Sequence, residues 1–163
     1  IAVCYATHPV NIHNKDADYF VSNDLWKAWS AVKPIVHAGI VLYNKDKVLG
    51  LLRKNNNWEF SGGGIEYYEE PEMAAVRELK EETGIIVPVE DLSLLGVARS
   101  EHDGRVDICI IYLARIKDCI RVILSDEHKD YRWMSLNELE NLTQDVAVKK
   151  IISLAKKVAN GGS

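Results

Sequence analysis

The sequence lacks the features that mark several classes of protein. None of its apolar runs approaches the roughly 20 residues that a helix needs to cross a bilayer, which excludes a helical membrane protein. Its three cysteines, Cys4, Cys109 and Cys119, form no Cys-x-x-Cys pair and cannot all pair within the chain. This excludes a disulfide scaffold and makes a reducing compartment, the cytoplasm, the simplest expectation.

The overall composition is that of an ordinary globular protein. Apolar residues make up 47% of the 163 residues and charged residues 27%, which excludes disordered and collagen-like chains. This length predicts one domain, and such a domain buries about 68–70% of the surface of its unfolded chain. The net charge of −4 argues against a general nucleic-acid binder, so no stable nucleic-acid partner is expected.

Residues 1–32 are expected to form an N-terminal extension packed on a main domain of residues 33–163. Within the extension, the spacing of Val21, Leu25 and Trp29 predicts a short amphipathic helix. Two interpretations are open for this helix. It can cover the core of the main domain, which we favour, or it can provide the contact of a homodimer.

The apolar pattern of the main domain predicts mainly β-strands at first. Residues 36–43 are almost continuously apolar and β-branched, which is typical of a buried strand. A polar turn at 44–47 and a second apolar run at 48–52 predict a hairpin. The short stretch 58–60 is followed by a serine and three glycines, to which the sequence assigns no helix or strand. Further strands are predicted at 92–98, 106–114 and 131–134, with a turn at 103–104.

Helix signals are local and clear. Pro71 suits a first helical position and Gly84 a left-handed cap, which predicts a helix over 71–83. Residues 135–138 form a capping box that opens a short helix. Asp145 is expected to cap a final helix with an apolar face of Val148, Ile151, Ile152, Ala155 and Val158. This order of elements predicts an α/β fold, a mixed sheet with helices on its faces.

Most of the acidity of the chain lies in one short stretch. Residues 66–82 hold seven glutamates against Arg77 and Lys80, so this stretch carries −5 and the rest of the chain +1. Glu78, Glu81 and Glu82 stand at i, i+3 and i+4, on one face of the predicted helix. Three crowded carboxylates offer hard oxygen ligands to Mg²⁺, Mn²⁺ or Ca²⁺. The alternative is a solvated acidic helix face, and the helix alone leaves both open.

The surrounding residues favour the metal site. Gly63, five residues, Glu69, seven residues, Arg77-Glu78-Leu79, one residue, Glu81-Glu82, one residue and Gly84-Ile85 match the Nudix box at every defining position over residues 63–85. The chain therefore resembles the Nudix hydrolase superfamily, and within it the MutT-like group. The stretches 58–60, 125–128 and 131–133 also look like the family, and the resemblance covers about residues 33–158.

The resemblance implies a Nudix α/β/α sandwich with a mixed central sheet. It also implies hydrolysis of a diphosphate linked to another group, by attack of water on phosphorus, with Mg²⁺ as cofactor and Mn²⁺ as an alternative. Carried over by position, the metal ligands are the carboxylates of Glu78, Glu81 and Glu82 and the carbonyl of Gly63.

The resemblance also assigns roles around the metal site. Arg77 would hold a carboxylate in place, with Glu69 as its partner. Glu78 is the first choice for the group that activates water. Glu127 is the second choice, as a base or as an extra metal ligand. Arg53 stands where family members often contact substrate phosphates. Apart from the resemblance, the aromatic ring of Tyr68 makes it our candidate for stacking on a base.

The substrate is less well defined by the sequence. Ser61 stands where the family usually has proline, and Tyr68 where glycine is common. The proline typical of ADP-ribose hydrolases is absent, because that region reads Arg99-Ser100-Glu101, and His102 occupies the neighbourhood of the diadenosine-polyphosphate tyrosine. A nucleoside triphosphate or deoxynucleoside triphosphate, unmodified or oxidised, is therefore the default small-molecule substrate.

Two other function classes stay open. One is a non-catalytic nucleotide-sensing Nudix module, which typically has a degraded box or an attached DNA-binding domain. The other is an enzyme like isopentenyl-diphosphate isomerase, which needs a catalytic cysteine, whereas Cys109 is more economically a core residue. Among the aromatic candidates, all but Tyr68 are expected in the core: Trp26, Trp29, Trp58, Tyr67 and Tyr112. His37, His102 and His128 are interpreted as surface or core residues.

Overall fold

The computed structural model describes residues 34–102, 105–117 and 120–159. All of them belong to the compact unit Val32–Ser163. Five expectations fall outside what the structure describes. They are the helix that contains Val21, Leu25 and Trp29, the tryptophan Trp26, the cysteines Cys4 and Cys119, the turn at 103–104, and the surface or core position of the His102 side chain.

A mixed, seven-stranded sheet forms the centre of the described structure. Its strand β1 runs parallel to β6 and antiparallel to β2 and β4. Strand β5 pairs with β6, while β2 also pairs with β3 and β7. The strands are β1 (Ile35–Asn44), β2 (Lys47–Arg53), β3 (Trp58–Glu59), β4 (Ser61–Gly64), β5 (Ser93–His102), β6 (Arg105–Ile116) and β7 (His128–Met134).

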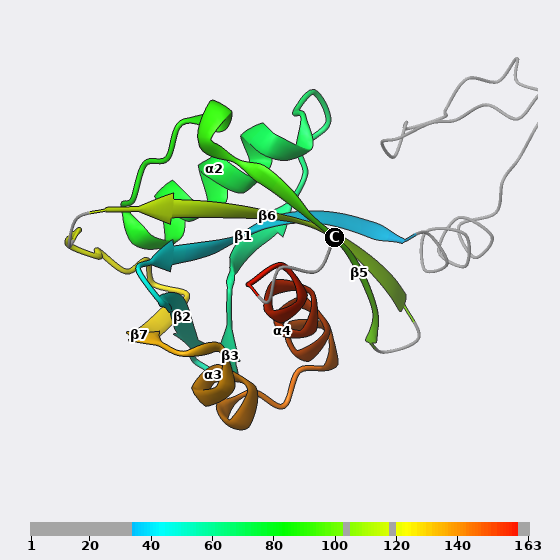
Figure 1. Ribbon diagram of the computed structural model, residues 1–163. Coiled ribbons are helices and arrows are strands. Elements are labelled where there is room, and N and C mark those ends of the chain that lie inside the picture. The colour runs from blue at the N-terminus through cyan, green and yellow to red at the C-terminus, as the bar shows by residue number, and fades with distance from the viewer. Residues whose placement is uncertain (1–33, 103–104, 118–119, 160–163) are drawn as a thin grey trace, which may run out of the picture. The chain divides into compact units, whose positions relative to one another are not determined.

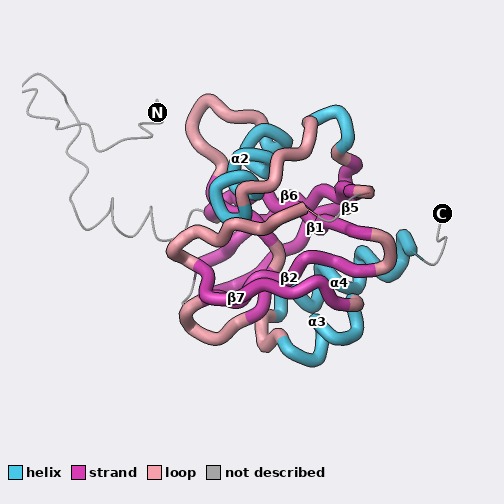
Figure 2. The backbone as a smooth tube through the Cα atoms, turned by 90° about the vertical axis from the view of Figure 1, so that its left-hand side faces the viewer, coloured by secondary structure: helices cyan, strands magenta, loops and turns pink. Residues whose placement is uncertain are grey.

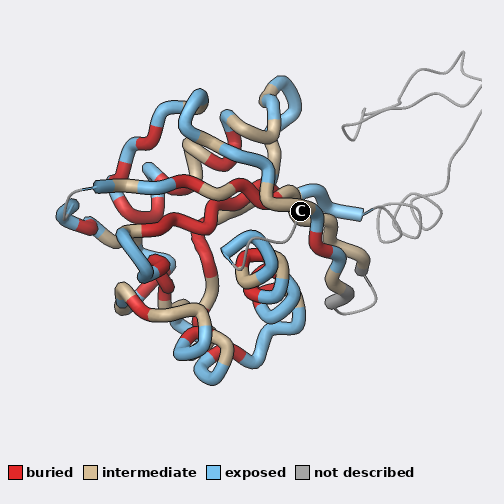
Figure 3. The backbone as a smooth tube through the Cα atoms, viewed as in Figure 1, coloured by how far each residue is buried: buried red, intermediate tan, exposed pale blue. Residues whose placement is uncertain are grey.

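Helices cover both faces of this sheet (Figures 1 and 2). Helix α2 (Pro71–Thr83) packs on one face, and α3 (Leu136–Leu142) and α4 (Val146–Ala159) pack on the other. Alternate residues of β1 point to opposite faces. Ala38, Ile40 and Leu42 therefore pack with α2, while Val41 and Tyr43 pack with α4. The central strands are accordingly buried (Figure 3), and the predicted α/β/α sandwich is confirmed.

Helix α2 has the bounds that its end signals predict. Pro71 is its first residue, and Gly84 ends it with φ +70°, donating its N–H to the Lys80 carbonyl at 2.8 Å. Glycine suits this left-handed cap because it has no Cβ to crowd the backbone. Ala74, Ala75, Leu79 and Thr83 are buried against the sheet, and Glu82 is buried with them.

The run of a serine and three glycines, which has no predicted element, is a strand. It forms β4, which runs antiparallel to β1. The two strands pair residue by residue, from Ile40 opposite Ser61 to His37 opposite Gly64. The two backbones approach so closely that a Cβ on Gly39 would lie 2.7 Å from the Ser61 carbonyl oxygen. A Cβ on Gly62 would lie 2.7 Å from the Ala38 carbonyl. Glycine is used here for close packing, which a sequence-local interpretation does not reveal.

Two further expectations are corrected by long-range contacts. Strand β7 begins at His128 instead of residue 131, because pairing with β2 brings His128 opposite Arg53. Val158 is 51% exposed, in the last turn of α4 beyond the buried residues of that helix, so it does not belong to the core face. No helix among the described residues is long and apolar enough to span a membrane.

Leu79→Ala is expected to lower the free energy of unfolding by about 2–5 kcal/mol, because it opens a cavity between α2 and the sheet. Leu79 is fully buried, whereas Met73 on the same helix is 53% exposed. Met73→Ala is therefore the matched control and is expected to change stability by about 0.5 kcal/mol or less. Urea unfolding followed by circular dichroism measures both, and equal losses would contradict this packing.

Candidate active site

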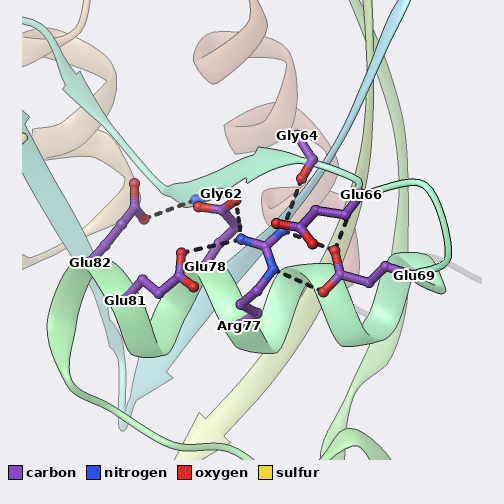
Figure 4. A network of polar contacts seen from close by, with 8 residues as sticks. All are labelled: Gly62, Gly64, Glu66, Glu69, Arg77, Glu78, Glu81 and Glu82. Atoms are coloured by element: carbon purple, nitrogen blue, oxygen red, sulfur yellow. Dashed lines mark hydrogen bonds and ion pairs between the residues drawn. The ribbon is translucent and has the colours of Figure 1, made fainter. Parts of the chain in front are cut away.

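One arginine organises the first half of the site. Arg77 Nε and Nη2 donate to the two carboxylate oxygens of Glu69, both at 2.9 Å, and Nη2 also donates to the Gly64 carbonyl at 2.9 Å (Figure 4). Its Nη1 donates to Glu78 at 2.7 Å and to Glu81 at 3.2 Å. The structure thus brings Arg77 and Glu69 together and ties the loop after β4 to helix α2.

The charges of this pair reinforce each other. The hydrogen bond from Arg77 holds the pKa of the Glu69 carboxyl below its usual range. The same bond, with a smaller contribution from Glu78, raises the pKa of Arg77. The backbone N–H of Glu66 adds a hydrogen bond to Glu69 at 3.2 Å. Glu69 is therefore an ionised anchor for the guanidinium.

The three carboxylates of α2 share a helix face but differ in exposure. The Glu78 and Glu82 side chains are 16% and 5% exposed, and that of Glu81 is 58% exposed. Glu78 lies directly against β4, since a Cβ on Gly63 would fall 2.6 Å from Glu78 Oε2. The backbone of Gly63 and the row of carboxylates therefore lie side by side.

Glu82 is the buried end of this row. Its Oε2 accepts a hydrogen bond from the Gly62 amide at 3.1 Å, and burial raises its pKa to about 7. The segment between β6 and β7 is also held next to Glu82, because Ser125 donates its N–H to the Glu82 carbonyl at 3.0 Å. A buried, crowded carboxylate is costly to ionise unless a cation neutralises it. The hard oxygen donors of this row fit Mg²⁺ or Mn²⁺ on these grounds.

Glu82 also belongs to a second cluster, which the sequence did not predict as a group. One ligand atom each of Glu59, Glu82 and His128 lies within 4.8 Å of the others, close enough to hold a metal ion. His128 Nε2 lies 3.0 Å from Glu59 Oε1 and 3.8 Å from Glu82 Oε1. His128 was expected either at the surface or in the core, and it is buried. Its ring faces the carboxylates of Glu59 and Glu82. The sequence carries no local signal for this cluster, because its members meet only through strand pairing.

Arg53 and Glu127 lie at the same end of the site. Arg53 Nε pairs with Glu59 Oε1. Partial burial lowers the pKa of Arg53, but hydrogen bonding to Glu59 and the charges of Glu59, Glu82 and Glu127 outweigh it and raise the pKa. Glu127 is exposed in the segment before β7, near enough to act on Arg53 electrostatically.

A cleft of about 760 Å³ adjoins these groups. Its lining includes Arg53 and Glu59, Ser61 and Gly62, Asp107 and Cys109 of β6, and Val148 and Ile151 of α4. Burial raises the pKa of the Cys109 thiol to about 12, so it stays protonated at neutral pH. A protonated thiol is a poor nucleophile, and this speaks against a catalytic cysteine at this position.

The aromatic residues divide between core and surface. Trp58 and Tyr112 are buried, as expected. Tyr67 is 63% exposed, so the expectation that it lies in the core is wrong. Tyr68 is 95% exposed and meets Tyr67 edge to face, with ring centroids 4.4 Å apart, on the loop between β4 and α2. None of these four aromatic residues lines the cleft.

Glu82→Gln is expected to stabilise the protein in the presence of a chelator at pH 8. A folded-state pKa of about 7 exceeds the ordinary glutamate value, so protonation favours the fold below about pH 4.5 and this contribution is lost as pH rises through 7. The neutral amide of the Glu82→Gln variant avoids that loss. Its free energy of unfolding is therefore expected to exceed that of the unmodified protein by about 1–3 kcal/mol at pH 8 and by less at pH 5.

Urea unfolding at the two pH values measures this effect, with Glu81→Gln on the same helix as the exposed control. Mn²⁺ should then raise the stability of the unmodified protein and should stabilise Glu82→Gln much less. A variant that is less stable than the unmodified protein at pH 8 without metal would contradict the role of burial.

Comparisons with known proteins agree with this geometry. The family model of the NUDIX domain matches residues 33–154. The chain is 35% identical over 145 residues to a protein named ADP-ribose pyrophosphatase from Methanocaldococcus jannaschii, covering 85% of this chain and 82% of that one. It is 33% identical over 107 residues to nucleoside triphosphatase NudI of Salmonella newport, covering 60% and 74%.

Solved structures share the fold. The MutT NUDIX hydrolase of Burkholderia pseudomallei is 26% identical, with a TM-score of 0.67 over 75% of this chain and 98% of its own. The Ap4A hydrolase of C. elegans, 23% identical, has a TM-score of 0.69 over 78% of this chain and 98% of its own. Fold, box and relatives agree, and the chain belongs to the NUDIX family as a Nudix-type hydrolase.

Proposed function

We propose that the chain hydrolyses a nucleoside triphosphate or deoxynucleoside triphosphate, unmodified or oxidised, in a metal-dependent reaction in which water attacks phosphorus. The observation that carries this proposal is the row of α2 carboxylates, braced by Arg77 and facing the β4 backbone beside a cleft. The relative named nucleoside triphosphatase supports this substrate class.

The proposed metal ligands are the carboxylates of Glu78, Glu81 and Glu82 and the Gly63 carbonyl, with Glu127 as an extra ligand. When bound there, Mg²⁺ or Mn²⁺ would polarise a phosphoryl oxygen and lower the pKa of a water. Glu82, held by the Gly62 amide, presents its carboxylate in a fixed orientation. A rigid helix is a suitable base for ligands, because it fixes their relative positions.

Glu78 is the proposed base that takes the proton from the attacking water. The hydrogen bond from Arg77 Nη1 fixes its carboxylate, and its half-buried position lies next to Gly63. Arg77 and Glu69 act here as positioning residues. Their bidentate pairing orients the guanidinium in a way that a lysine cannot reproduce.

Arg53 and Tyr68 are the proposed contacts to substrate. Arg53 lines the cleft and is 41% exposed at its side chain, which suits contact with a phosphate. Tyr68 offers an exposed ring on the loop beside α2. ADP-ribose is the second candidate substrate, favoured by the relative of that name, which matches more of the chain. We rank ADP-ribose second because the proline typical of ADP-ribose hydrolases is missing from the region Arg99-Ser100-Glu101.

The organisation beyond the site is also a proposal. Residues 33–163 are proposed as the hydrolase domain, with residues 1–32 as an extension packed on it. The match of the family model to residues 33–154 supports the first boundary. A homodimer and a cytoplasmic location complete the proposal.

The first test is release of phosphate or pyrophosphate across a panel of nucleotides with Mg²⁺ or Mn²⁺. Turnover is expected with one or more nucleoside triphosphates, and chelation should abolish it. Glu82→Gln should reduce turnover by at least about 10²-fold, because the buried ligand is lost. Glu140→Gln, which changes a carboxylate on α3 paired with Lys156, is the matched control.

The panel also contains ADP-ribose, dinucleoside polyphosphates, nucleotide sugars and isopentenyl diphosphate. Turnover of ADP-ribose alone would favour this second candidate substrate over a nucleoside triphosphate. Nucleotide binding without turnover, by a folded protein that binds Mn²⁺, would favour the sensing module. Formation of an isomer from isopentenyl diphosphate would favour the isomerase.

The base is assigned by comparing two variants of the active protein. Glu78→Gln is expected to lower kcat by about 10²–10⁴-fold, the usual contribution of a general base. Glu127→Gln is expected to lower kcat much less, because Glu127 is exposed and outside the α2 row. Single-turnover kinetics at saturating metal measures both. The opposite ranking would assign the base to Glu127.

A further inference from the structure

Three charged or polar residues from neighbouring strands meet beside Glu82. Strand β2 lies between β3 and β7, with Leu51 opposite Glu59 and Arg53 opposite His128. The pairing of β2 with β7 shifts register between Leu52 and Arg53, and this shift places His128, instead of Lys129, opposite Arg53. Strand pairing therefore brings Arg53, Glu59 and His128 together near Glu82.

Glu59 is the common acceptor of this group. Its Oε1 pairs with Arg53 Nε and lies 3.0 Å from His128 Nε2. The His128 side chain is fully buried, and within the described part of the chain its Nδ1 has no hydrogen-bond partner. A neutral ring with its proton on Nε2 avoids a buried, unpaired N–H. Nε2 then donates to Glu59, so the carboxylate is held from two sides.

This arrangement fixes Arg53 by one edge of its guanidinium. Its backbone is also fixed, because Arg53 N–H donates to the Asn57 carbonyl at 2.9 Å and the Asn56 N–H donates to the Arg53 carbonyl at 3.0 Å. Among the described residues, Nη1 and Nη2 of Arg53 have no hydrogen-bond partner. Arg53 lines the cleft together with Gly62, whose amide holds Glu82.

We propose that Glu59 and His128 are positioning residues for Arg53, holding its guanidinium so that Nη1 and Nη2 present a fork to the diphosphate of the substrate. Planar, bidentate contact with phosphate oxygens requires such a fixed orientation. The inference rests on the proposed function, because it assigns the diphosphate to the cleft beside Glu82. It adds two residues to the site that lie outside the α2 row.

The competing arrangement is a metal ion held by Glu59, Glu82 and His128. The pairing of Glu59 Oε1 with the Arg53 guanidinium opposes it, since a cation on the same oxygen would meet a fixed positive charge at short range. In the positioning arrangement, loss of Glu59 leaves the affinity for the metal unchanged and affects binding of phosphate. In the metal arrangement, the affinity for the metal falls.

The experiment measures two affinities by calorimetry on the full chain, that of Mn²⁺ alone and that of inorganic pyrophosphate with Mg²⁺ present. Arg53→Ala is expected to weaken pyrophosphate binding by about tenfold or more, the effect of losing a charge-assisted contact. Glu59→Ala should weaken it by about three- to tenfold, and the double variant no more than Arg53→Ala alone. Glu59→Gln should restore most of the affinity, because its amide oxygen can still accept from Arg53 Nε.

Matched controls separate orientation from charge. Lys54→Ala removes the neighbouring exposed cation, and Glu140→Gln neutralises a paired carboxylate on α3. Both should leave pyrophosphate affinity within about twofold. His128→Gln keeps an N–H donor on the side chain and should bind more tightly than His128→Leu. Circular dichroism verifies folding, and the Glu59 variants decide the outcome if a His128 variant does not fold.

Three results would overturn the proposal. They are weaker Mn²⁺ binding in Glu59→Ala, effects of Glu59→Ala and Arg53→Ala that multiply in the double variant, and an unmodified protein that binds no pyrophosphate. The proposed function fails separately. A protein that shows the expected pyrophosphate pattern but hydrolyses no nucleotide would retain the positioning role and lose the hydrolase. In an active protein, Glu59→Ala should raise KM and leave kcat within about threefold.

Discussion

The site depends on how one guanidinium, that of Arg77, is shared among carboxylates. Glu69, Glu78 and Glu81 all accept hydrogen bonds from it, and so does the carbonyl of Gly64. Without this cation, the crowded glutamates of residues 66–82 would repel each other along the helix and the loop before it. Because the shared bonds cross from loop to helix, the same interaction that offsets the charge also fixes the geometry of the carboxylate row.

Glu82 lies outside the reach of this arginine and is stabilised differently. It is buried, accepts a backbone amide, and faces a group in which Glu59 links Arg53 to His128. Positive charge thus borders the carboxylate row at both ends, with Arg77 on one side and Arg53 on the other. A carboxylate whose pKa burial raises to about 7 destabilises the metal-free fold at higher pH, as expected where a site is built for a cation.

The sheet provides the framework for both ends. Strand β1 pairs with β4 closely enough to require glycine at Gly39 and Gly62, and this places the β4 backbone against Glu78. Strand β2 contributes Arg53 and pairs on its two sides with the strands that carry Glu59 and His128. Helix α2, packed through Leu79 on the same sheet, completes the arrangement. Core packing therefore determines the distances within the site.

The sequence by itself determined the features that depend on neighbours along the chain. Pro71 and Gly84 define α2, and the spacing of Glu78, Glu81 and Glu82 defines a helix face, because capping and the helical period act within a few residues. Only the tertiary structure decided that the glycine run is strand β4, and that His128 meets Glu59, 69 residues away in the chain. It also decided that Tyr67 is exposed. Strand pairing and burial join distant segments, and no local pattern encodes which segments will meet.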